Sequence, residues 1–141
     1  MALIDIFFRT VPTTSDLTFE FPAHGTSVAE ARRRVRAHLQ DQGCGDDTCD
    51  TAVLLVSELF TNALRHTASA TIGCTVRTER DELRIEVQDE GRGAELVPGP
   101  AGSAAVDGRG LLMVDALSAA WGVSADGRGQ TVWCTVPNDP S

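Results

Sequence analysis

The sequence predicts an α/β two-layer sandwich, in which a mixed, mostly antiparallel sheet is covered by helices on one face. Short segments with alternating apolar side chains predict strands, and longer segments with apolar residues three or four positions apart predict helices. Their order is strand, two helices, two strands, a loop, a helix and two strands, which suits one sheet under one helical layer. A chain of 141 residues is long enough to bury a core. We therefore expect a single domain over residues 17–137, with an extension or edge strand at 1–16 and a tail at 138–141.

The first two elements are a strand and a helix. Residues 17–21 alternate between apolar and polar, and Pro22 ends the strand because proline cannot donate to a sheet. Ser27 and Glu30 have the spacing of a capping box, which predicts the start of a helix over residues 29–40.

Four arginines fill the outer faces of this first helix: Arg32, Arg33, Arg34 and Arg36. One interpretation is a solvated helix surface. The other is a docking surface for an acidic partner. The sequence alone leaves both open.

A second, longer helix is expected over residues 47–67, and it is apolar nearly all round. A helix of this kind is normally buried. Its exceptions are Glu58, Asn62, Arg65 and His66, which fall within roughly a 100° arc at about 100° per residue. Burying such groups without partners is costly, so this polar arc must face either a hydrogen-bond network or a ligand.

The second half of the chain contains four further strands, one helix and a long loop. The loop, residues 90–107, is rich in Gly, Pro and Ala and suits a lid over a site. The expected strands and helix are, in order, 70–79, 82–89, the helix 111–119, 121–125 and 131–136.

Composition excludes several functions. The formal net charge is −8, which argues against nucleic acid or an anionic membrane as the main partner. All twelve basic residues are arginines, so a phosphate loop that needs its lysine and Schiff-base chemistry are both excluded. No segment reads as a signal peptide or a membrane span, so we expect a cytoplasmic protein.

The four cysteines are expected to be reduced thiols: Cys44, Cys49, Cys74 and Cys134. A zinc site at Cys44 and Cys49 would need two more well-placed ligands.

Two glycine-containing motifs suit a nucleotide. Asp89 ends a strand and is followed by Gly91 and Gly93, and an acceptor-only carboxylate suits the exocyclic amine of adenine. Residues 108–110, Gly-Arg-Gly, precede a helix, where free N–H groups and the helix dipole favour phosphate. The alternative interpretation of each motif is an ordinary surface turn.

The polar arc of the long helix suits a metal and a base. Asn62 offers an amide oxygen of the kind that Mg²⁺ accepts, and Glu58 lies one turn earlier, where a general base could address a hydroxyl. The alternative is a buried hydrogen-bond network that includes Arg65.

Four short motifs occur in order along the chain: Glu58-x-x-x-Asn62-Ala63 with His66, Asp89-x-Gly91-x-Gly93, Gly108-x-Gly110-Leu111, and Thr131. Together they resemble the GHKL ATPase superfamily, whose ATP-binding domain has the Bergerat fold. Within this superfamily, the small size of the chain and its sequence Asn-Ala-Leu-Arg-His at residues 62–66 resemble those of the stand-alone anti-sigma-factor serine/threonine kinases.

The resemblance implies an ATP site with Mg²⁺ bridging the phosphates. Asn62 would hold the Mg²⁺, and Glu58 would be the catalytic base. Asp89 would bind the adenine amine, and Thr131 would complete the base contact. The remaining nucleotide-binding positions implied by the motif match are Arg65, His66, Gly91, Gly93, Gly108, Arg109, Gly110 and Leu111. The chain departs from the family in having a short lid without lysine, so the phosphate charge would fall to arginines or backbone N–H groups.

Three functions follow as hypotheses. The first, implied by the resemblance, is a Mg²⁺-ATP-dependent kinase that phosphorylates a serine of an antagonist protein, sequesters a sigma factor and forms a homodimer. The second is a nucleotide-gated binding module with negligible turnover. The third is an ATP-independent structural domain.

Overall fold

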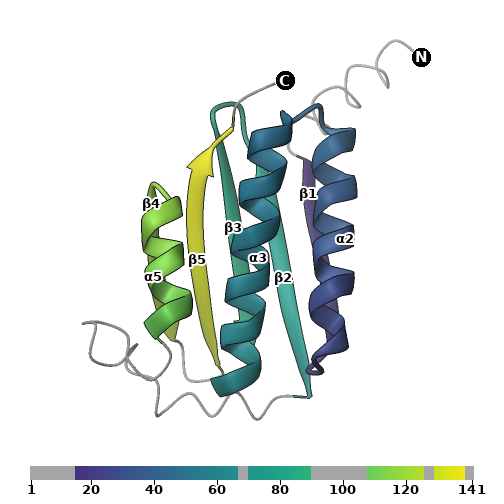
Figure 1. Ribbon diagram of the computed structural model, residues 1–141. Coiled ribbons are helices and arrows are strands. Elements are labelled where there is room, and N and C mark those ends of the chain that lie inside the picture. Colours follow the sequence, from purple (N-terminus) through teal and green to yellow (C-terminus); the bar gives the residue numbers. More distant parts are fainter. Residues whose placement is uncertain (1–14, 67–69, 90–107, 126–128, 139–141) are drawn as a thin grey trace, which may run out of the picture.

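A five-stranded sheet is covered on one face by three helices in the computed structural model, which describes residues 15–66, 70–89, 108–125 and 129–138 (Figure 1). The fold class that the sequence predicts is thereby confirmed. The strand order is β1-β2-β3-β5-β4, so the last strand of the chain lies inside the sheet and β4 lies at its edge.

Every pairing between neighbouring strands of the described sheet is antiparallel, so the parallel component expected of a mixed sheet is not found there. Two hairpin partners, β2 and β3, are joined by the short turn expected near residues 80–81. The strands are β1 Ser15–Pro22, β2 Thr71–Thr78, β3 Glu82–Asp89, β4 Ala120–Ala125 and β5 Gln130–Pro137.

The helices are α2 Thr26–Asp41, α3 Asp46–His66 and α5 Gly108–Leu117. The long helix α3 lies between α2 and α5 and also packs on β2, β3 and β5. Its apolar side explains this central place, because Leu55, Leu59 and Phe60 are fully buried. These side chains pack into one core with the inward residues of the sheet, such as Ile85.

The first helix begins earlier than the sequence predicts. Its N-cap is Gly25, and no side chain caps it. The capping box expected at Ser27 does not form, because the Ser27 hydroxyl donates to the carbonyl of Pro22 at 2.8 Å and ties the helix to the end of β1. Gly43 then ends α2 with φ of +81°, a left-handed conformation that suits glycine.

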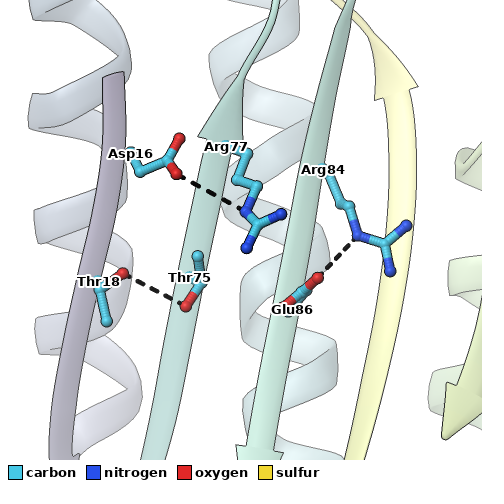
Figure 2. Close-up of polar contacts among 6 residues, drawn as sticks. All are labelled: Asp16, Thr18, Thr75, Arg77, Arg84 and Glu86. Carbon is cyan, nitrogen blue, oxygen red and sulfur yellow. Dashed lines mark hydrogen bonds and ion pairs between the residues drawn. The ribbon is translucent and has the colours of Figure 1, made fainter. Parts of the chain in front are cut away.

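The face of the sheet away from the helices carries polar side chains (Figure 2). Thr18 and Thr75 lie within hydrogen-bond distance across β1 and β2, at 3.4 Å, and an ion pair joins Arg84 Nε to Glu86 at 2.8 Å. The Arg84 guanidinium also stacks over the ring of Trp133, at 4.4 Å from its centroid. We call this surface the outer face of the sheet.

All four cysteines are buried and free. Burial raises the pKa of the Cys74 and Cys134 thiols to about 12. Burial also raises the pKa of Cys44 and Cys49. In the described parts of the chain, no group of three or more His, Cys, Asp or Glu side chains is placed to hold a metal ion. Within the same parts, no helix has both the length and the hydropathy to cross a bilayer.

Candidate functional site

The chain connections bring the sequence motifs to one end of the sheet. Helix α3 ends at His66, and β2 begins five residues later at Thr71. The second residue of β2, Ile72, pairs with Asp89, and Asp89 pairs with Gln130. The C-terminal end of α3, the end of β3 and the start of β5 therefore meet at the same end, which is the lower end in Figure 1.

Helix α5 has its first turn at this end as well. Its other end is fixed far away, because the backbone N–H of Ala119 donates to the carbonyl of Thr135 near the end of β5. Residues 108–110, which the sequence places just before a helix, form the first turn of α5 itself. The N–H groups at the start of a helix have no partner within it, so this turn can receive an anion. Leu111, the next residue, is buried in the core and holds the turn against it.

Asn62 belongs to the helical arc that the sequence singled out, and it is buried where Glu58 and Arg65 are not. It is 5% exposed, and its Oδ1 atom has no hydrogen-bond partner among the residues that the structure describes. Leaving a buried acceptor unsatisfied costs roughly 1–3 kcal/mol, so this oxygen is suited to a ligand rather than to fold stability. Glu58, one turn earlier, is half-buried and can reach solvent.

Asp89 and Gln130 lie side by side on the inner face of the sheet. They are register partners across β3 and β5, and they are 7% and 6% exposed. The next inward pair is Val87 and Val132, which contributes no polar side-chain atom. The Oε1 atom of Gln130 has no hydrogen-bond partner within the described residues. The inner end of the sheet thus presents two buried polar side chains next to each other.

Thr131 does not join this pair. Its register partners are Gln88 on β3 and Ser124 on β4. Because side chains alternate along a strand, Thr131 lies on the outer face while Gln130 lies on the inner one. Gln130 is the residue that motif reasoning missed. The signal was present in the sequence, because residue 130 shares the parity of the apolar residues at 132, 134 and 136.

The other predicted positions are less informative. Gly91 and Gly93 lie outside the described residues, as does the loop 90–107. Arg65 is exposed and has an interaction of its own, and His66 is the last residue of α3.

The arginines of α2 have partners within the chain. Arg32 Nη1 donates to Ser57 Oγ at 3.3 Å, and Arg36 pairs with Asp50 at 3.1 Å. Arg33 pairs with Glu30, and Arg34 stacks over the rings of Phe19 and Phe21. A groove of about 380 Å³ is lined by Arg32, Arg33 and Arg36 of α2 and by Val53 of α3, and Asp89 is not part of its lining. These internal contacts favour the interpretation of the arginines as a solvated structural surface.

Comparison with known proteins agrees with this architecture. The family model described as "Histidine kinase-like ATPase domain" matches residues 21–136. An uncharacterized protein of Streptomyces coelicolor is 34% identical over 89 residues, which cover 60% of this chain and 84% of that protein.

Two solved structures have a similar fold. One contains the RsbU and RsbW domains of Rv1364c from Mycobacterium tuberculosis, with a TM-score of 0.66 and 18% identity. That match covers 89% of this chain and 33% of the other, so the chain spans about a third of that structure. The second is a chain of the SiaB-SiaC complex from Pseudomonas aeruginosa, with a TM-score of 0.56, 15% identity and 96% coverage of both chains. The match over residues 21–136, on a fold that brings Asn62 and Asp89 to one end of the sheet, shows that the chain belongs to the histidine kinase-like ATPase domain family.

Proposed function

We propose that this chain is a Mg²⁺-ATP-dependent serine/threonine protein kinase of the anti-sigma-factor type. It would transfer phosphate from ATP to a serine of an antagonist protein and so control transcription by partner switching. The observation that carries the proposal is the pair formed by Glu58 and Asn62. A carboxylate with access to solvent lies one helical turn from a buried amide oxygen that no described residue satisfies.

Asn62 is suited to act as a ligand of Mg²⁺. Mg²⁺ takes oxygen ligands and usually keeps several waters, so it is bound through few protein groups together with substrate phosphates. The buried Oδ1 of Asn62 is a neutral oxygen of this kind. When bound, Mg²⁺ would neutralise charge that develops on the phosphates.

Glu58 fits a general base because it is half-buried rather than enclosed. Its carboxylate would accept the proton of a partner's serine hydroxyl as that oxygen attacks the γ-phosphorus of ATP, the bond from that phosphorus to the bridging oxygen breaks, and ADP leaves. Asp89 would hold the base of the nucleotide. The first turn of α5 would receive phosphate through its backbone N–H groups, and Arg109 would supply positive charge because the chain contains no lysine.

The partner in this proposal is a protein. The family match supports nucleotide binding, and one of the two similar structures is a complex of two different proteins, SiaB and SiaC. The homodimer implied by the resemblance stays a prediction. Light scattering on the purified protein tests it by measuring the molar mass in solution.

The experiment uses the full chain with and without Mg²⁺-ATP to capture a partner, followed by transfer of radiolabelled phosphate and mapping of the phosphorylated residue. Glu58→Ala should keep ATP binding in calorimetry but abolish transfer to the captured serine. Glu30→Ala is the matched control, because Glu30 is an exposed helical carboxylate on α2 paired with Arg33. Transfer by Glu58→Ala at the rate of the unchanged protein would exclude Glu58 as the base.

A second candidate function is a nucleotide-gated binding module. It is favoured by the absence of lysine, which leaves phosphoryl transfer without the cation that usually supports it. This function predicts that the protein captures its partner only with ATP present and transfers no label to it. Label on a partner serine excludes it.

A further inference from the structure

Gln130 is a buried polar residue with no structural explanation in the described chain. It opens β5 on the inner face of the sheet, is 6% exposed, and has Asp89 and Ala125 as its register partners. Its Oε1 atom accepts no hydrogen bond from any described residue. A buried acceptor that the fold leaves unsatisfied points to a ligand group that donates to it.

The pair of Asp89 and Gln130 offers a specific combination of hydrogen-bonding groups. An ionised carboxylate only accepts hydrogen bonds, whereas a glutamine amide both donates and accepts. Adenine presents an exocyclic amine, which donates, beside ring nitrogens, which accept. Guanine presents a carbonyl oxygen at the position of that amine, where a carboxylate would meet another acceptor. The exocyclic amine has two hydrogens, so the pair complements adenine with the Asp89 carboxylate on one hydrogen and the unsatisfied Oε1 of Gln130 on the other.

We propose that Gln130 is a base-specificity residue, whose Oε1 atom accepts one hydrogen of the exocyclic amine of adenine while Asp89 accepts the other. This inference rests on the nucleotide site of the proposed function. It assigns to Gln130 the base contact that the motif match would give to Thr131. The assignment follows from the β3–β5 register, which puts Gln130 beside Asp89 and Thr131 on the outer face.

Binding calorimetry with Mg²⁺ and ATP, on the full chain, tests the assignment. Gln130→Ala should weaken ATP binding about tenfold, the equivalent of one strong hydrogen bond at 1.4 kcal/mol per factor of ten. Thr131→Ala is the matched control on the same strand and should bind ATP within about twofold of the unchanged protein, because its side chain lies on the other face. A cooperative thermal unfolding transition, recorded for each variant before the binding measurement, shows that the variant is folded.

An analogue of ATP identifies the ligand group. In purine riboside triphosphate, hydrogen replaces the exocyclic amine. The loss caused by Gln130→Ala should disappear with this analogue, because the hydrogen bond is already absent there. A loss that persists at full size with the analogue overturns the proposal.

The outcomes separate this inference from the proposed function. If the unchanged protein binds no Mg²⁺-ATP, both fail. If it binds Mg²⁺-ATP and Gln130→Ala binds as tightly as Thr131→Ala, the nucleotide site stands and the role of Gln130 is overturned.

Discussion

The indole ring of Trp133 lies against Gly122 on the outer face of the sheet. The two residues are register partners on β4 and β5, and a Cβ atom built on Gly122 would lie 2.8 Å from Cζ2 of the ring. That distance is shorter than carbon atoms in contact allow. The Arg84 guanidinium also stacks on this ring and pairs with Glu86. Gly122, Trp133 and Arg84 therefore form one packed unit across three strands.

Gly122→Ala should destabilise the protein by about 1–3 kcal/mol, because the added methyl group forces the Trp133 ring off its position. Urea unfolding measures the change. Gly25→Ala is the control, since a Cβ built there has no described atom within 4 Å apart from its own chain neighbours and helix backbone, and it should change stability by less than about 0.5 kcal/mol. Equal stabilities of the two variants would mean that the ring moves aside at no cost.

Arg84→Lys should destabilise the protein by about 1 kcal/mol although it keeps the charge. A lysine ammonium lacks the planar group that stacks on the Trp133 ring while pairing with Glu86. Arg36→Lys is the control, because the Arg36–Asp50 pair is exposed and such pairs contribute little. Thermal unfolding should separate the two variants, and similar midpoints would rule out the stacking contribution.

Stability should fall as pH rises from about 9 to about 12. The pKa of Cys74 and Cys134 is raised from 9.0 to about 12 in the folded protein, so each thiol keeps its proton there while the unfolded chain loses it. Stability is therefore full below pH 9 and is lost as pH rises toward the folded pKa. The chain has neither tyrosine nor lysine, so the main other side chains that titrate in this window are Cys44 and Cys49, whose pKa burial also raises.

Urea unfolding between pH 8 and pH 11 measures this dependence. The double variant Cys74→Ala, Cys134→Ala should have lower stability at pH 8 but a shallower decline above pH 9. An unchanged slope in that variant would assign the pH dependence to groups other than these two thiols.

Asn62→Leu should leave the nucleotide-free protein as stable as before, or raise its stability by about 1 kcal/mol. The change removes a buried acceptor that no described residue satisfies and replaces it with an apolar side chain of similar size. The same variant should lose the Mg²⁺ dependence of ATP binding in calorimetry. Ser57→Ala is the contrasting control, since Ser57 Oγ accepts from Arg32 and its loss should destabilise. A destabilised Asn62→Leu protein would show that Asn62 serves the fold.

Much of the fold follows from local patterns. The strand 82–89 has the bounds predicted from strict alternation, and its apolar residues all face the helices. The bounds of α2 were predicted less well, because Ser27 bonds to the carbonyl of Pro22 instead of capping its own helix. A side chain's choice between two acceptors depends on which one the tertiary structure brings close, and spacing along the chain does not contain that information.

The sequence by itself determined which face of each element is buried and that Glu58, Asn62 and Asp89 are polar groups in apolar surroundings. Side chains alternate between the two faces of a strand with a period of two, so the sequence pattern also predicts that Gln130 faces inward. Only the tertiary structure decided that β5, and not β4, lies beside β3, which puts Gln130 next to Asp89. Strand order depends on how the whole core packs, through contacts between residues far apart in the sequence, so the local pattern does not predict it.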